Sequence, residues 1–330
     1  MEIKSQPTMY VVNSNAIGDT VATLPILKDL INNYHKDGDY GIIALPQFRD
    51  LFFFIDNDHF YDINQQLEFK KEYSIKKLNI AEPDKTAYVV LPNQQPIPIK
   101  LGGQYLEPLR IHLSQYAGLQ FSKKIYDISE CSYLTYPINK QRNEEILDKF
   151  KIDFSKCVLI NLTYRGATRI IPEETLIAFC NYIKEKGFYP LFVGKTETPD
   201  YVNDAPYKNT KFDTSIGLDL RDKTTLEEMI YVIHNSHSII GVDNGLIHLA
   251  SMTNTPIIAS YTSCSPETRC PVRFGKLGGG IEIIEADAEC RYCSDKWLID
   301  GHDFNNCYYA TNACCNSLNL EKFVKAFNKL

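Results

Sequence analysis

The sequence predicts an α/β protein of two domains, each built on a parallel β-sheet. A chain of 330 residues exceeds the ~100–200 residues that one hydrophobic core usually supports. The composition, 44% hydrophobic and 23% charged, is that of a globular protein and excludes disordered and collagen-like classes. Buried-strand patterns alternate with helical patterns in two separate series, which is typical of parallel sheets covered by helices.

The first series opens with a strand, a tight turn and a helix. The β-rich run is MYVVNSN, and the amphipathic helix that follows, ended by a glycine, is IGDTVATLPILKDLINNYHKDG. Two further buried-strand candidates, each ending at a proline, are YGIIALPQF and AYVVLPN, and helical spacing of apolar residues recurs in LRIHLSQYAGL. We expect this N-terminal domain to span residues 1–145.

The second series begins near residue 156 and follows the same alternation. Its predicted strands are CVLINLT, YPLFVG, HSIIGVD and PIIASYTS, and its predicted helices are PEETLIAFCNYIKEKG, TTLEEMIYVIHNS and GLIHLASMTNT. Thr224 or Thr225 is the expected N-cap of the second of these helices. We expect this C-terminal domain to span residues 146–318, with a terminal helix at 319–330 that begins at an Asn cap.

Charge and hydropathy exclude several classes of protein. A net charge of −6 argues against a protein whose main role is to grip nucleic acid, because phosphate-backbone binding needs a basic surface. The N-terminus lacks a basic segment followed by an apolar one, and no apolar run approaches the ~18 residues of a membrane span. We therefore expect a soluble, cytoplasmic protein.

The segment IGVDNGLIHLA, residues 240–250, predicts a ligand site. A strand there passes through an Asn-Gly turn into a helix, and in open α/β sheets ligands lie outside the carboxyl ends of strands, where unpaired helix N–H groups can face an anion. Gly245 lets the backbone come close to a ligand, and His248 lies one turn into the helix. The alternative is a plain Asn-Gly turn with a half-buried histidine bonded to a carbonyl.

The ten cysteines are unevenly distributed, and half of them crowd near the C-terminal end. The crowded cysteines are Cys290, Cys293, Cys307, Cys314 and Cys315. A Cys-x-x-Cys pair with two more thiolates could close a tetrahedral site for zinc, the default occupant, or for iron. We predict Cys290, Cys293, Cys307 and Cys314 as ligands of a structural metal within a Cys-rich segment at 290–315. The doubled cysteine leaves the fourth ligand open between Cys314 and Cys315, and His302 is a spare candidate. Free core cysteines and disulfides are the alternatives.

Four segments together resemble glycosyltransferase family 9, the heptosyltransferases. In chain order they are NSNAIGDTVATLPILKDL, NLTYRGATRIIPEETLIAFCNYIKEKGFYPLFVG, DKTTLEEMIYVIHNSHSIIGVDNGLIHLAS and PIIASYTSCSPETRCP. The resemblance covers residues 9 to about 272 and is weakest at 47–140, on the acceptor side. It implies a GT-B fold, in which two Rossmann-like domains face each other across a central cleft.

The resemblance also implies catalytic roles. Gly18-Asp19 matches the family's Gly-Asp, whose carboxylate is taken as the general base that deprotonates the acceptor hydroxyl; the structural alternative is that Asp19 only caps a helix. Arg169 matches a basic position that would neutralise the diphosphate leaving group, because a guanidinium fork fits phosphate oxygens. Ile171 stands where the family has an aromatic residue before the proline.

Further residues match positions that bind the nucleotide sugar. Thr163 matches a hydroxyl near the phosphates, and Thr224 matches a loop whose backbone reads the adenine edge in relatives that use ADP-sugars. The family's Asp-Thr-Gly…His pattern corresponds to Asp243, Asn244, Gly245 and His248.

The implied reaction is transfer of a heptose-like sugar, with inversion, from an ADP-linked donor to an acceptor hydroxyl. It needs no organic cofactor and no metal at the phosphates, because Arg169 and a helix dipole would stabilise the leaving group. The acceptor stays open between a lipopolysaccharide core, a protein hydroxyl and, less in keeping with the acidic charge, a modified nucleobase in DNA. The cysteine cluster is similar to the four-cysteine iron-binding finger of some protein-modifying members. That finger would act as a brace or an oligomer contact.

Two other functions remain alternatives. One is nucleotide-sugar epimerisation by an enzyme of related fold, and the other is non-catalytic binding of a nucleotide sugar. Peripheral membrane contact through the basic face of KFVKAFNKL is also open, although a solvated helix is the simpler interpretation.

Overall fold

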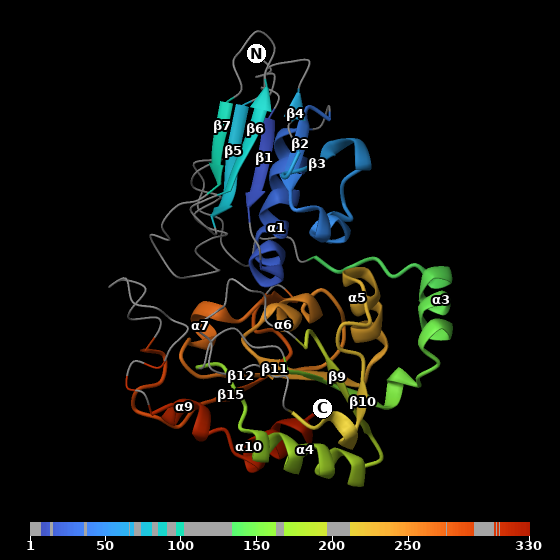
Figure 1. Ribbon diagram of the computed structural model, residues 1–330, viewed down its shortest axis with the longest axis vertical. Coiled ribbons are helices and arrows are strands. Elements are labelled where there is room, and N and C mark those ends of the chain that lie inside the picture. Colours follow the sequence, from blue (N-terminus) through green and yellow to red (C-terminus); the bar gives the residue numbers. More distant parts are fainter. Residues whose placement is uncertain are drawn as a thin grey trace. The chain divides into compact units, whose positions relative to one another are not determined.

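The computed structural model of the chain forms two compact units, Met1–Leu134 and Thr135–Leu330 (Figure 1). It describes residues 8–13, 16–35, 38–65, 67–68, 74–80, 85–90, 97–101, 134–162, 168–196, 212–274, 276–293, 307, 309 and 311–330. Residue 145, where the sequence places the domain boundary, lies inside helix α3 (Lys140–Phe150) of the second unit. The roles expected of the two domains stay predictions.

The first unit contains a parallel sheet of strand order β3-β2-β1-β5. Its strands are β1 (Thr8–Asn13), β2 (Tyr40–Ala44), β3 (Phe60–Asp62) and β5 (Ser74–Ile80). Helix α1 (Ile17–Tyr34) follows β1 and contacts β1 and β5, and the short helices η1 (Pro46–Phe52) and η2 (Asn57–His59) follow β2. The strand, turn and helix expected at the start of the chain are therefore confirmed.

A second, smaller sheet accounts for one of the expected strands. The run AYVVLPN lies in β6 (Lys85–Val90), which pairs parallel with β4 (Leu67–Glu68) and antiparallel with β7 (Ile97–Leu101). The expected helix at LRIHLSQYAGL lies outside the described residues.

The second unit is organised around a six-stranded, fully parallel sheet of order β10-β9-β8-β11-β12-β15. Its strands are β8 (Cys157–Asn161), β9 (Tyr189–Val193), β10 (Leu218–Asp219), β11 (Ser238–Val242), β12 (Ile257–Tyr261) and β15 (Ile281–Glu285). Every residue of β8, β11 and β12 is buried, as expected for central strands covered on both faces. The α/β class with two parallel sheets is therefore confirmed.

The strand order reverses direction at the centre of this sheet. From β8 the chain moves outward through β9 to β10, and it then returns to β11 and moves the opposite way through β12 to β15. Right-handed crossovers in opposite directions place helices on opposite faces. Accordingly, α4 (Glu173–Glu185) and α10 (Leu320–Phe327) lie on one face, and α5 (Leu226–Asn235) and α6 (Gly245–Ala250) lie on the other (Figure 1).

Aromatic packing joins the last described helix to the core. The ring of Phe179 on α4 lies 5.7 Å from that of Phe323 and 5.8 Å from that of Phe327, both on α10. Thr175 Oγ1 donates a hydrogen bond of 2.9 Å to the carbonyl of Leu318 just before α10. Asn319 caps α10 by accepting from Lys322 N, which confirms the expected Asn cap.

The connection between β12 and β15 contains a short hairpin, and the cysteine-rich part of the chain follows β15. The hairpin follows helix α7 (Pro266–Arg269) and consists of β13 (Val272–Arg273) and β14 (Lys276–Leu277). Helix α9 (Ala313–Asn316) precedes α10. None of the helices within the described ranges combines the length and apolar character that crossing a lipid bilayer requires.

Candidate functional site

The reversal between β8 and β11 is where an open α/β sheet is expected to bind a ligand. The two chain segments leave the carboxyl ends of these neighbouring strands in opposite directions. In open α/β sheets, such a reversal is where a ligand-binding crevice generally lies. The predicted residues Arg169 and Asp243 lie just beyond β8 and β11, respectively. The fold thus brings together two segments that are far apart in the sequence.

Arg169, Asp243 and His248 form one buried polar cluster. Arg169 Nη1 lies 3.3 Å from Asp243 Oδ2 and 3.4 Å from the Asp243 carbonyl oxygen. His248 Nε2 lies 3.5 Å from the other carboxylate oxygen, Oδ1. The three residues are 7%, 3% and 1% exposed. Because an isolated buried charge is costly, the Asp243 carboxylate between a guanidinium and an imidazole is a fixed part of the site.

The Asn244 side chain caps helix α6 by accepting hydrogen bonds from the backbone amides that were expected to face an anion. Its Oδ1 accepts from Leu246 N at 3.0 Å and from Ile247 N at 3.2 Å. The Asn244 Nδ2 atom is buried and has no hydrogen-bond partner among the described residues. His248 is fully buried and its Nε2 lies near a carboxylate, so the expected half-burial is wrong.

Hydroxyl groups from the end of β12 hold the segment that precedes Arg169. Thr262 Oγ1 donates to the Thr168 carbonyl, and Ser263 Oγ donates to Thr168 Oγ1 at 3.0 Å. Ile171 is buried in the hydrophobic core of the second unit. These contacts fix the backbone on both sides of Arg169. No sequence motif marks them, so they were not predicted.

One thiol near this cluster is kept in its neutral form. Burial, together with the charge of Asp243, raises the pKa of Cys270 to about 11, although the Tyr261 hydroxyl acts in the opposite direction. A thiol with this pKa is not a nucleophile at neutral pH.

The segment between β10 and α5 carries the predicted residue Thr224, which is half-buried. The next residue, Thr225, caps α5 with a reciprocal capping box to Glu228, which confirms one of the two expected caps. Arg221 donates to both carboxylate oxygens of Asp219, with Nη2 to Oδ2 at 2.7 Å. Burial would raise the pKa of Asp219, but the hydrogen bonds from Arg221 and Thr214 outweigh it and lower that pKa to about 2.

In the first unit, Gly18 and Asp19 lie in the first turn of α1, beyond the carboxyl end of β1. The N-cap of α1 is Ala16, so the alternative that Asp19 is only a helix cap is wrong. Thr163 lies outside the described residues.

The predicted metal ligands lie within the described residues. Cys314 and Cys315 are buried on α9 beside Ala286, and Asn312 N donates to Cys307 Sγ at 3.3 Å. Burial raises the pKa of Cys290, and the charges of Cys314 and Cys307 act in the same direction. The cysteines in the described ranges are free thiols, and these ranges contain no group of three His, Cys, Asp or Glu residues arranged to hold a metal ion.

Comparison with known proteins gives a family match. Residues 119–295 match the family described as glycosyltransferase family 9 (heptosyltransferase). No curated protein matches the chain.

Solved structures share the fold at low sequence identity. A family 9 glycosyltransferase from Veillonella parvula is 14% identical, with a TM-score of 0.62 over 100% of this chain and 98% of that one. The iron-containing dodecameric glycosyltransferase TibC from enterotoxigenic E. coli is 13% identical, with a TM-score of 0.64 over 100% and 77% of the two chains. The ADP-heptose lipopolysaccharide heptosyltransferase II of E. coli is 14% identical, with a TM-score of 0.57 over 98% of each.

Proposed function

The chain belongs to glycosyltransferase family 9, and on this premise we propose that it transfers a heptose-like sugar from an ADP-linked donor to an acceptor hydroxyl, with inversion. The observation that carries the proposal is the buried cluster of Arg169, Asp243 and His248 at the point where the strand order reverses. The similarity to an E. coli enzyme that uses ADP-heptose supports the choice of donor.

The diphosphate of the donor would be bound at the segments that follow β8 and β11. Arg169 supplies a fixed positive charge that stabilises the leaving diphosphate as the bond to the sugar breaks. At the start of α6, phosphate oxygens would replace Asn244 Oδ1 as acceptors from Leu246 N and Ile247 N. Gly245 would allow the close approach, and Thr163 would supply a hydroxyl.

Asp19 would act as the general base. Its carboxylate removes the proton of the acceptor hydroxyl, the resulting oxygen nucleophile attacks the anomeric carbon, and the nucleoside diphosphate leaves from the opposite face. Attack opposite the leaving group inverts the configuration. The buried Gly18 precedes this carboxylate in the first turn of α1.

The cysteine-rich segment would hold a structural iron or zinc through Cys290, Cys293, Cys307 and Cys314. A set of thiolates suits either metal, and the Cys-x-x-Cys pair with two further cysteines supplies four such ligands. The iron-containing relative TibC supports this proposal. A metal there would brace the segment after β15. Elemental analysis of the purified protein and of Cys307→Ser tests it, since loss of bound metal in the variant is expected.

Ligand binding and turnover test the proposed function together. ADP at 100 times its dissociation constant should stabilise the folded chain by about 2.7 kcal/mol, whereas UDP, GDP and CMP at equal concentration should not. Asp19→Asn should retain this stabilisation and lose sugar transfer. Stabilisation by none of the nucleotides, or undiminished transfer by Asp19→Asn, would contradict the proposal. Release of free sugar or an altered nucleotide sugar without any acceptor would instead indicate an epimerase.

A further inference from the structure

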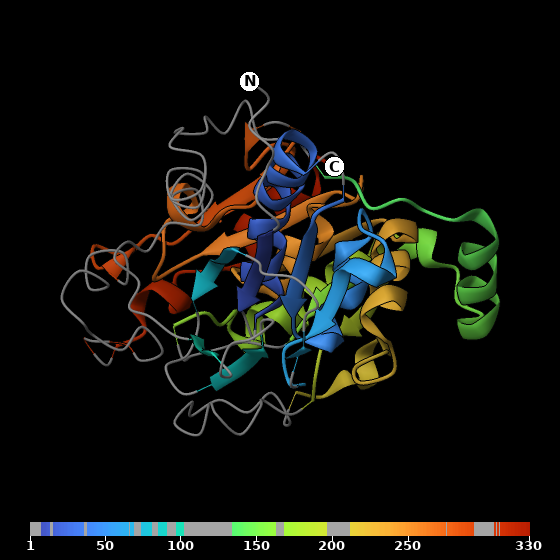
Figure 2. The same cartoon turned by 90° about the horizontal axis from the view of Figure 1, so that it is seen from above.

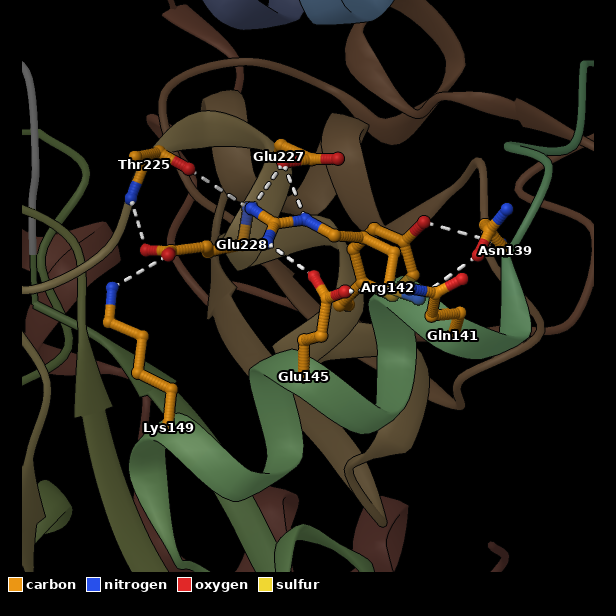
Figure 3. Close-up of polar contacts among 9 residues, drawn as sticks. Asn139, Gln141, Arg142, Glu145, Lys149, Thr225, Glu227 and Glu228 are labelled. Carbon is orange, nitrogen blue, oxygen red and sulfur yellow. Dashed lines mark hydrogen bonds and ion pairs between the residues drawn. The ribbon is translucent and has the colours of Figure 1, made fainter.

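Helix α3, the first helix of the second unit, lies beside α5 in both views of the structure (Figures 1 and 2). Ile146 is the buried residue of α3. Polar side chains make the connection, and those of Arg142 and Lys149 reach the first turn of α5 (Figure 3). Near the other end of α5, Asn235 Nδ2 donates to Asn143 Oδ1 at 2.6 Å.

The Arg142 side chain is 38% exposed, and its partner Glu227 on α5 is 29% exposed. Its Nη2 and Nε donate to Glu227 Oε2 at 2.8 and 3.2 Å, and its Nη1 donates to Glu145 Oε2 at 3.1 Å. Exposed ion pairs contribute little to stability, but a guanidinium held by two carboxylates has a defined orientation.

The contact of Lys149 differs because its partner is buried. The Glu228 side chain is 8% exposed, and Oε1 accepts from Lys149 Nζ at 2.6 Å while Oε2 accepts from Thr225 N at 3.0 Å. Burial would raise the pKa of Glu228, but the hydrogen bonds from Lys149 and from the Thr225 backbone outweigh it and lower that pKa. One carboxylate therefore connects α3 to the peptide that precedes α5.

That peptide joins Thr224 to Thr225 and is planar and trans. The Thr224 carbonyl and the Thr225 N–H belong to one rigid unit and point in opposite directions. When Glu228 holds the N–H, it also sets the direction of the carbonyl. Lys149 fixes Glu228 in turn, so a side chain on α3 controls the orientation of a backbone acceptor at Thr224.

We infer that Lys149, acting through Glu228, is a positioning residue that orients the Thr224 carbonyl toward the base of the bound nucleotide. The inference rests on the proposed function and on the expectation that the loop carrying Thr224 reads the adenine edge of the donor. A carbonyl can accept from the 6-amino group of adenine, whereas the 6-oxo group of guanine presents a second acceptor and leaves the carbonyl unpaired. Lys149 therefore contributes to selection of the base and has no part in binding the phosphates.

The test compares Lys149→Met with Lys140→Met in the full chain. Lys140 lies on the same helix, is 92% exposed and reaches Glu144 only at 4.0 Å, so its replacement is a matched control. Binding of ADP, GDP and inorganic pyrophosphate is measured for each variant. Lys149→Met should weaken ADP binding about 3- to 10-fold, the range for one net hydrogen bond, and leave GDP and pyrophosphate unchanged.

Kinetics and a conservative variant separate positioning from a general loss of structure. Lys149→Met should raise KM for the donor with kcat unchanged, and Lys149→Arg should restore both the KM and the preference for ADP over GDP. Equal weakening of ADP and pyrophosphate, or equal behaviour of Lys149→Met and Lys140→Met, would overturn the inference.

Hydrogen exchange keeps this result distinct from failure of the proposed function. If the wild-type chain binds no nucleotide, the proposed function fails, and with it the role in base selection. The connection from Lys149 through Glu228 to the Thr225 amide is then tested by measuring amide hydrogen exchange in residues 222–228. Faster exchange there in Lys149→Met, and not in Lys140→Met, would support control of this segment by α3. Unchanged exchange would exclude it.

Discussion

Removal of one partner from the Arg169–Asp243 pair should destabilise the protein strongly. Both side chains are almost fully buried, and the Arg169 Nη1 atom contacts the side chain and the backbone of Asp243. Arg169→Met fills a similar volume but removes the guanidinium that lies 3.3 Å from the buried Asp243 carboxylate. Loss of one member of a buried ion pair costs about 3–5 kcal/mol. For a unit of this size each kcal/mol shifts Tm by about 2–4 °C, so we expect a fall of roughly 6–20 °C.

A double-mutant cycle makes this prediction specific. In Arg169→Met/Asp243→Asn no buried carboxylate lacks its cation, so the double variant should recover about 0.5–3 kcal/mol relative to the sum of the single effects. Thermal unfolding of the full chain at neutral pH is the assay. Lys156→Met is the control, because its pair with Asp153 is exposed and at 3.9 Å, and its Tm should barely change. Strict additivity, or a loss below about 1 kcal/mol in Arg169→Met, would refute the argument from burial.

Three further predictions concern the Asn244 cap of α6, the pH dependence of stability in acid and the aromatic packing between α4 and α10. Asn244→Ala removes two hydrogen bonds at the start of α6 and should cost about 1 kcal/mol in urea unfolding, whereas Asn244→Ser retains a cap and should cost less. The pKa of Asp219 is lowered to about 2, so its stabilising contribution is complete above its unfolded value of 3.8 and is lost as pH falls toward 2; Asp219→Asn should flatten the pH dependence of the unfolding free energy in that window. Phe179→Ala should lower the unfolding free energy by about 3–5 kcal/mol, because it leaves a cavity in the aromatic packing between α4 and α10. Replacement of Tyr189, which is 53% exposed, should change that free energy little.

The sequence predicted the central strands well because burial on both faces leaves a readable signal. Strands β8, β11 and β12 are continuous apolar runs, and the caps Thr225 and Asn319 stand at the positions that helix chemistry favours. Strand β5 escaped prediction because its sequence, SIKKLNI, interrupts the apolar pattern with two lysines and an asparagine. That segment is a strand because it pairs with β1, and its amino-acid composition does not predict this pairing.

The site was predictable only in part. The motif containing Asp243 and His248 marked a ligand position, but nothing in the residues themselves shows that Arg169, 74 positions earlier, contacts that carboxylate. The hydroxyls of Thr262 and Ser263 and the link from Lys149 to Glu228 escaped prediction for the same reason. Such contacts depend on which strands become neighbours, and helical or strand periodicity carries no information about that.

The bond between Thr175 and Leu318 spans 143 positions, and it has a consequence for the order of folding. The face of the sheet that α4 covers cannot be completed until residues 318–327 have emerged from the ribosome. Contacts of this separation form late, because closing a long loop must precede the gain from packing. Until then, Phe179 and its apolar neighbours are open to chaperones and to aggregation. Substitutions in α10 should therefore reduce the yield of folded enzyme while leaving the donor affinity of the molecules that do fold unchanged.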